Sequence, residues 1–227
     1  MSSIFQQALG LDFDRLHPRL QQRFGFSSSD HTACIGTGAM DRVWHGRAGL
    51  GPFLHLGAAR NLMFPETGTR MPFTIENYAY RDGFDRETVT FVRTFEVGQG
   101  RRRRFDATMV LSPEHGTIVD YLGTHQHVAA DLDLRVDATG GLVIRSGGFR
   151  LYEGRLGMRL PPQLAADALV RESFDDEAGC FRISVEVTNR VVGPVFGYHG
   201  RFTARFPDVA EGGVPAAVKP YREECRV

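Results

Sequence analysis

The residues PFTIENYAYRDGFDRETVTFVRTFEV, at positions 72–97, form two runs of alternating side chains on either side of Asp82 and Gly83. A period of two around a DG turn signal is typical of a β-hairpin. In the second run, Glu87 and Arg93 fall on the same face as the apolar side chains, because alternate residues of a strand point the same way. The hairpin therefore predicts a sheet that directs charged groups toward its own apolar side.

The same period continues along most of the chain. The connections between the runs are short and rich in turn signals, too short for crossover helices, so neighbouring strands should pair antiparallel. About ten such strands curl into a barrel, a strongly curved sheet or a two-layer sandwich. We predict a mainly β fold, an antiparallel β-barrel or strongly curved sheet of about ten strands, at 33–45, 73–81, 86–97, 103–112, 117–123, 126–137, 142–154, 167–174, 180–190 and 195–206.

The first 26 residues predict short helices instead. Ser2 or Ser3 can cap a first helix that Gly10 ends, and Pro18 suits the first position of a second helix. The segment 51–64 is ambiguous between helix and loop. We expect a single β-barrel-like domain over residues 1–210, with a helical N-terminus (1–26). Residues 211–227, rich in Pro, Gly and charges, should form an irregular tail that packs loosely or not at all.

Composition restricts the function classes. The 27 basic and 27 acidic residues cancel, so no global field attracts nucleic acid or an anionic membrane. The three cysteines form neither a zinc pattern nor a disulfide framework, and Cys34 is better explained as a small buried hydrophobe than as a nucleophile. Neither a signal peptide nor an apolar run of about 18 residues is present. We expect a soluble, cytoplasmic protein.

Parity along the strands identifies polar residues that should point inward. An unpaired buried charge is costly, so such groups must pair, remain protonated or face a wet cavity. A polar-lined ligand cavity is typical of a barrel of this size. The alternative is that Glu87 and Glu153 emerge at the rim while Arg93 forms one buried pair. The candidate catalytic residues are Glu87, Arg93, Asp120, Glu153, Glu172 and Tyr198, and the candidate ligand-binding residues are Asn77, Tyr78, Tyr80, Arg81, Phe91 and Gln126.

Two histidines have a spacing that is compatible with metal ligands. His125 and His127 lie two residues apart and therefore on one face of a strand, a spacing that metal ligands use. The apolar parity of 128–134 turns both away from the core, so we predict no metal site; the alternative is a bulge near Gly123 that turns both inward. No Gly-rich phosphate loop or nucleophile elbow is present either, and we predict no cofactor.

Five strings, MFPETG, PFTIENYAYRDGFDRETVTFVRTF, RRFDATMV, IVDYLGTHQH and FGYHGRF, together resemble a bacterial family of uncharacterised domains of unknown function. The resemblance covers most of residues 3–206. That family is also found fused to saccharopine-dehydrogenase-like reductases, which implies a small-molecule metabolic setting. It implies no catalytic residues, so the candidate site depends on the parity of the strands alone.

Three hypotheses about function follow. The first is a cofactor-independent enzyme, an isomerase, cyclase or dehydratase that performs acid–base chemistry on an apolar metabolite. The second is a non-catalytic carrier or sensor barrel that uses the same cavity. The third is a structural or partner-binding module whose interior charges are paired. The expected partner is a small apolar molecule, with no nucleic acid and no membrane, and the chain is compatible with a homodimer.

Overall fold

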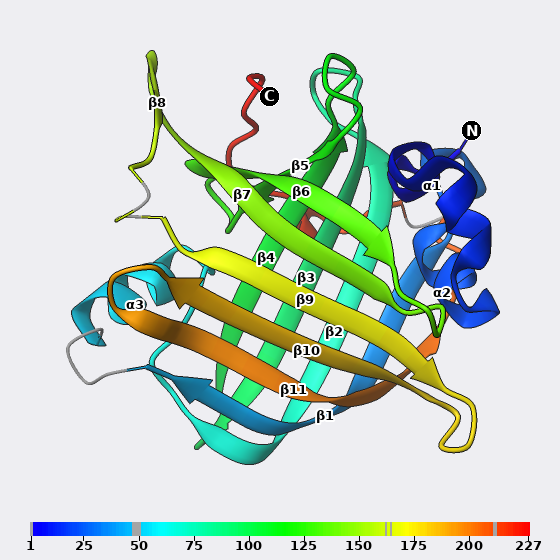
Figure 1. Cartoon of the computed structure of the whole chain (residues 1–227), viewed down its shortest axis with the longest axis horizontal. Coiled ribbons are helices and arrows are strands. Elements are labelled where there is room, and N and C mark those ends of the chain that lie inside the picture. The colour runs from blue at the N-terminus through cyan, green and yellow to red at the C-terminus, as the bar shows by residue number, and fades with distance from the viewer. Residues whose placement is uncertain (1, 47–50, 162, 164, 211–212) are drawn as a thin grey trace.

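Ten antiparallel strands form a closed barrel in the computed structural model (Figure 1). The structure describes residues 2–46, 51–161, 163, 165–210 and 213–227. Successive strands pair as a meander, and the pairing of the first strand with the last closes the barrel. The strands are β1 (Ala33–His45), β2 (Gly68–Arg81), β3 (Glu87–Gly98), β4 (Arg101–Leu111), β5 (Ile118–Leu122), β6 (Val128–Val136), β7 (Leu142–Glu153), β9 (Asp167–Asp175), β10 (Cys180–Asn189) and β11 (Gly193–Arg205), with the extra strand β8 (Leu156–Arg159) paired to β7.

The mainly β prediction is confirmed, and the structure resolves the choice between barrel and open curved sheet. β1 pairs with β11 from Ile35 opposite Arg205 to His45 opposite Phe196. Glycines let this closing pair pack tightly: a Cβ atom on Gly36 would lie 2.6 Å from the ring of Phe202. Any larger residue at this position would push against the aromatic core.

Short helices lie across the two ends of the barrel (Figure 1). At one end are α1 (Ile4–Leu9), η1 (Gly10–Arg15), α2 (Pro18–Phe24) and η2 (Ser28–Asp30), which hold the N-terminal segment. The side chain of Ser3 caps α1, and Pro18 opens α2, as predicted. At the other end lies the helix α3 (Gly51–Ala59), in a segment whose sequence is ambiguous between helix and loop. Among the described residues, no helix is long and apolar enough to cross a membrane.

Aromatic side chains make up much of the core inside the barrel. Phe5 and Phe24, from the N-terminal helices, pack on Phe91 of β3 with ring centroids 6.1 and 6.4 Å away. Toward the α3 end, Phe64 packs on Phe95 of β3 and on Phe196, at 4.9 and 5.0 Å. Each end is thus sealed by phenylalanine from a segment outside the barrel wall.

The C-terminal tail packs firmly on the barrel, contrary to the expectation that it would pack loosely. It is irregular apart from the short η4 (Ala216–Val218). Val218 is buried, and it packs with Tyr78 and Val92 on the outer face of the barrel. Glu224 is also buried, and its backbone N–H donates to the side chain of Gln126 at 2.6 Å. Apolar residues on the outer face of β2 and β3 require such a cover.

Candidate functional site

Seven polar side chains, each from a different element, enter the barrel interior or its helix-capped end. They separate into two groups that carry different chemistry. One group centres on Arg23 of α2 and is called here the Arg23 cluster. The other is called the polar centre. The Arg23 cluster consists of Arg23, Cys34, Asn77 and Glu172, and the polar centre of Arg93, Asp120 and Tyr198, all of them buried.

The Arg23 cluster is a buried ion pair in which Nη2 of Arg23 and Nδ2 of Asn77 have no hydrogen-bond partner among the described residues. The Arg23 guanidinium donates from Nε to Glu172 on β9, from Nη1 to Asn77 Oδ1 at 2.6 Å, and from Nη1 to Cys34 Sγ at 3.0 Å. Its carbon Cζ also lies 5.0 Å from the ring centroid of Phe202. Burial raises the pKa of the Cys34 thiol, which disfavours the thiolate that a nucleophile requires. This cluster anchors α2 to the barrel.

The polar centre lies between the two aromatic layers of the core. Arg93 is flanked along β3 by Phe91 and Phe95, and its Cζ lies 5.3 Å from the ring centroids of both Phe91 and Phe105. The ring of Tyr198 on β11 packs on Phe95 at 5.1 Å. Burial raises the pKa of both the Asp120 carboxyl and the Tyr198 phenol, and the charge of Arg93 opposes both shifts, which places the three groups in one electrostatic neighbourhood.

Polar atoms of this centre make no hydrogen bond with any described residue. They are Nε of Arg93, Oδ1 of Asp120 and the hydroxyl of Tyr198, all inaccessible to solvent. More than nine in ten buried polar groups in proteins have a partner, and each unsatisfied group costs about 1–3 kcal/mol. Three such atoms from three strands therefore indicate a hydrogen-bond partner from outside the chain, either a ligand or ordered water.

Burial gives the polar centre its acid–base character. Loss of solvent raises the pKa of Asp120 to about 7, although Arg93 opposes the shift. The same cause raises the pKa of Tyr198 to about 12. Asp120 can therefore be present in both protonation states near neutral pH, whereas Tyr198 remains a hydrogen-bond donor. A carboxyl group that titrates near pH 7 beside a cation and a phenol is a combination suited to proton transfer.

Two of the predicted carboxylates lie away from the polar centre. Glu87 sits near the N-terminal helices, where its carboxylate accepts from the backbone N–H of Ser28 at 2.6 Å and from the Ser28 hydroxyl at 2.7 Å. It therefore anchors η2. The inward orientation predicted for Glu153 is wrong: its side chain is 68% exposed and lies 3.0 Å from His127. Glu153 is the last residue of β7. It lies past the last β6–β7 pair, Val128 with Leu151, and pairs only with Leu156 of β8, so it sits beyond the barrel interior.

The predicted ligand-binding residues also divide between the two faces of the wall. Asn77 and Phe91 face the interior. Tyr80 lies on the outer face, where its hydroxyl contacts Thr90 at 3.0 Å and Lys219 of the tail lies 5.0 Å from its ring. The tail covers three of these side chains, those of Tyr78, Tyr80 and Gln126. Arg81 is exposed at the end of β2, with its Nε 3.5 Å from the carboxylate of Glu87.

The histidine pair lies outside the barrel. His125 and His127 stack with ring centroids 5.8 Å apart. Nδ1 of His127 lies 2.9 Å from Nη1 of Arg222 in the tail and 3.0 Å from the carbonyl oxygen of Tyr152. Among the described residues, no group of three or more His, Cys, Asp or Glu side chains is placed to hold a metal ion.

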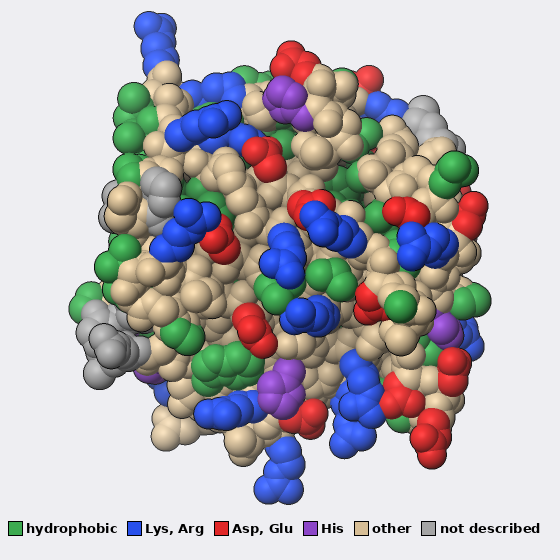
Figure 2. Space-filling model, in the orientation of Figure 1, with side chains coloured by type: hydrophobic (Ala, Val, Ile, Leu, Met, Phe, Trp, Pro, Cys, Tyr) green, Lys and Arg blue, Asp and Glu red, His purple; other side chains and the backbone are tan. Residues whose placement is uncertain are grey.

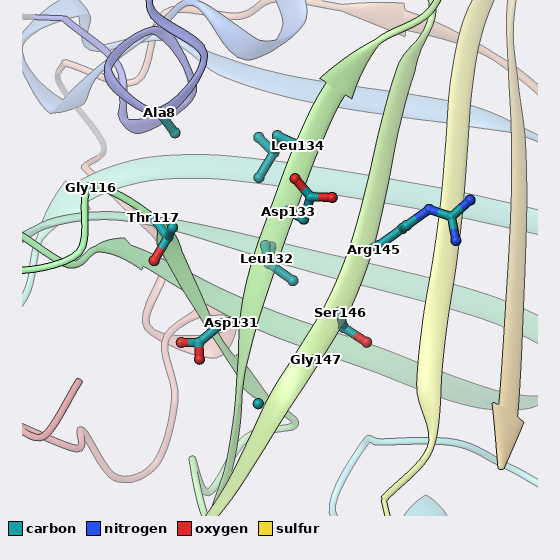
Figure 3. Close-up of a pocket in the computed structure, with 11 residues that line it drawn as sticks. Ala8, Gly116, Thr117, Asp131, Leu132, Asp133, Leu134, Arg145, Ser146 and Gly147 are labelled. Atoms are coloured by element: carbon teal, nitrogen blue, oxygen red, sulfur yellow. The ribbon is translucent and has the colours of Figure 1, made fainter. Parts of the chain in front are cut away.

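A groove of about 380 Å³ opens on the barrel wall beside α1 (Figure 3). It is bordered by Asp131, Leu132 and Asp133 of β6, and by Arg145 and Ser146 of β7. The carboxylate of Asp131 is already held by Arg150, at 2.7 and 2.8 Å. None of the candidate residues named from the sequence lines this groove.

Sequence reasoning missed Arg23. A signal was available, because Leu20, Arg23 and Phe24 follow the i, i+3, i+4 spacing of one helical face, and all three are buried. A charged residue on a buried helical face predicts that its side chain pairs with a polar group inside the protein. Its acceptor, Glu172, lies 149 residues further along the chain, so the pair itself could not be recognised from local pattern.

The protein is thus a closed ten-stranded barrel with polar groups from several strands in an aromatic interior. The chain belongs to the family described as "Domain of unknown function (DUF4166)", whose model matches residues 16–202. It is 33% identical over 202 residues to the uncharacterized protein YndH of Bacillus subtilis (strain 168), an alignment that covers 89% of this chain and 97% of that protein. No solved structure matches the chain significantly.

Proposed function

We propose that the barrel binds a small, largely apolar molecule in its interior and that the polar centre orients this molecule. The supporting observation is the set of buried, unsatisfied atoms on Arg93, Asp120 and Tyr198. The surrounding phenylalanine rings would hold the apolar part of the ligand, and the polar centre would bind one oxygen-containing group. Ligand sites in proteins commonly combine an apolar lining with a few convergent polar groups.

The chemistry best suited to this centre is a proton transfer that needs no cofactor. Asp120, with its pKa raised to about 7 by burial, would remove a proton beside a carbonyl group and return it to a neighbouring carbon. Arg93 and Tyr198 would stabilise the negative charge that develops on the carbonyl oxygen. The proposed reaction class is isomerisation, cyclisation or dehydration.

The alternative is a non-catalytic carrier or sensor that uses the same interior. Helices across both ends of the barrel favour it, because Phe24 of the α2 end and Phe64 of the α3 end are both buried. Such closure slows exchange of a bound molecule, which suits retention better than rapid turnover. In this case Asp120 would bind the ligand without exchanging a proton with it.

The test is native mass spectrometry of protein purified from its own host. We expect a co-purifying small molecule in the wild type and its loss in Arg93→Met, while Arg201→Met, an exposed change on β11, retains it. If the protein is an enzyme, the Asp120→Asn variant keeps the molecule bound but no longer converts it. If it is a carrier, neither the wild type nor the Asp120→Asn variant converts it. Wild-type protein without any bound molecule, together with an Arg93→Met variant of unchanged or greater stability, would show a purely structural centre.

A further inference from the structure

Six large apolar side chains are exposed at the end of the barrel that carries α3. On α3, Phe53 is 52% and Leu56 is 65% exposed. On β8, Leu156 is 56% and Met158 is 44% exposed. The β10–β11 turn adds Val191 and Val192, at 68% and 41%. These six residues are called here the apolar rim. Single exposed apolar residues are ordinary, but several on one end of a molecule mark an interaction surface.

The elements of the apolar rim are joined around the barrel end. β1 leads into α3, and the backbone N–H of Gly46 donates to Val195 O at 2.9 Å, which ties this connection to β11. The side chain of Asn189, at the β10–β11 turn, donates to the carbonyl oxygens of Gln163 and Ala165, in the segment between β8 and β9. In Figure 1 α3, β8 and the β10–β11 turn all lie on the same side of the barrel, at the left.

Charge is distributed unevenly along the barrel axis, although the chain is neutral as a whole. At the α3 end, β8 and the described connections carry Arg60, Arg155, Arg159 and Arg190. Acids at this end lie beside basic side chains: Glu66 is 2.6 Å from Arg103, Glu153 is 3.0 Å from His127, and Asp167 is 3.7 Å from Arg190. The turns at the opposite end are mainly acidic, with Asp82, Asp85, Glu114, Asp137, Asp176 and Glu177.

The two sets of side chains are visible on the surface. Figure 2 shows hydrophobic side chains along the edge that carries β8 and α3 (left), with basic side chains above them. Acidic side chains gather at the lower right, where Figure 1 places the turn between β9 and β10. The expectation that no membrane is attracted depends on the net charge of zero. It treats the charges as evenly mixed over the surface, whereas the two ends of the barrel differ.

We propose that the apolar rim docks on a lipid bilayer that contains anionic lipids. Apolar side chains surrounded by arginines fit the interface of such a bilayer, where the acyl boundary accepts the apolar groups and the headgroups attract the cations. A second copy of the chain fits less well. A twofold contact through this surface would bring the arginines of one copy against those of the other. The proposal does not depend on an interior ligand.

Co-sedimentation with vesicles tests the proposal. One set of vesicles contains phosphatidylcholine alone, and the other contains phosphatidylcholine mixed with phosphatidylglycerol. We expect binding to the mixed vesicles, weaker binding to the neutral ones, and loss of the difference as salt screens the arginines. Arg155→Glu combined with Arg159→Glu should weaken binding to mixed vesicles by a factor of about 25, since each positive charge lost costs a factor of about five. Phe53→Ser combined with Leu156→Ser should weaken binding to both kinds of vesicle.

Matched controls lie at the opposite end. Leu11→Ser removes a leucine that is 91% exposed in η1, and Arg205→Glu reverses an exposed arginine at the end of β11. Both should bind mixed vesicles like the wild type, as should Arg93→Met, which separates docking from interior ligand binding. Absence of wild-type binding, or equal losses in the controls, would overturn the proposal. So would a wild-type dimer, detected by light scattering, that Phe53→Ser with Leu156→Ser dissociates while vesicle binding is unchanged.

Discussion

Replacing Asp120 by asparagine should remove a pH-dependent loss of stability that this buried carboxyl imposes on the fold. Burial raises its pKa from 3.8 to about 7. Below pH 3.8 both the folded and the unfolded chain carry the proton. As the pH rises above that value, the unfolded chain ionises while the folded chain stays protonated, so the free energy of unfolding decreases until the pH passes about 7.

The magnitude follows from the size of the shift. One pKa unit corresponds to about 1.4 kcal/mol, so Asp120 lowers the free energy of unfolding by roughly 4 kcal/mol above neutral pH. Roughly 3 kcal/mol of this loss falls between pH 5 and about pH 8. Asparagine has nearly the same shape and does not ionise. The advantage of the variant over the wild type should therefore grow with pH.

Urea unfolding of wild type and Asp120→Asn across this pH range gives the difference directly. We expect the difference to increase by about 3 kcal/mol toward the alkaline end. Asp133→Asn, whose carboxylate is 51% exposed beside Arg135, is the matched control and should show no such trend. A constant difference between Asp120→Asn and wild type at every pH would show that Asp120 is ionised in the folded protein, and the proposed proton transfer would lose its basis.

Three other variants test the surrounding structure. Arg23→Met should lower the free energy of unfolding by about 3–5 kcal/mol, because it leaves Glu172 buried without its cation; thermal and urea unfolding measure this, and a loss under about 1 kcal/mol would contradict the pairing. Glu224→Ala should cost about 1–2 kcal/mol, since it removes the acceptor of Arg222 and Arg226; limited proteolysis should then release the tail first. Glu153→Gln should leave interior ligand binding unchanged, and loss of the co-purifying molecule would contradict its outward position.

The strand boundaries could be predicted because local sequence sets them. The turn signals between the runs lie where the structure has its turns, and β1 spans the predicted residues 33–45. The choice of a closed barrel could not be predicted, because it depends on the pairing of β1 with β11, strands far apart in sequence. The short β8 was missed, since its four residues are all exposed and show no alternating burial.

The parity argument worked inside the barrel wall and failed where a strand extends past it. It placed Arg93 and Tyr198 among residues that the structure buries. It failed for Glu153, because the end of β7 pairs with β8 alone, beyond the barrel interior. It also could not show that the tail covers the outer face, where Tyr78 and Tyr80 are buried without facing the interior. Burial and interior position are different properties in a barrel with an outer cover.

The two buried arginines of this barrel provide an internal comparison. Arg23 has a carboxylate, an amide oxygen and a thiol as hydrogen-bond acceptors. Arg93 is also buried, and its Nε has no acceptor among the described residues. Arg23 likewise leaves its Nη2 without a partner among them, so an unsatisfied nitrogen alone does not separate the two arginines. The difference lies in the neighbouring acceptor: Glu172 accepts from Nε of Arg23, whereas Oδ1 of Asp120, near Arg93, has no donor among the described residues. Because each unsatisfied group is costly, the three atoms on Arg93, Asp120 and Tyr198 are what supports the proposed ligand.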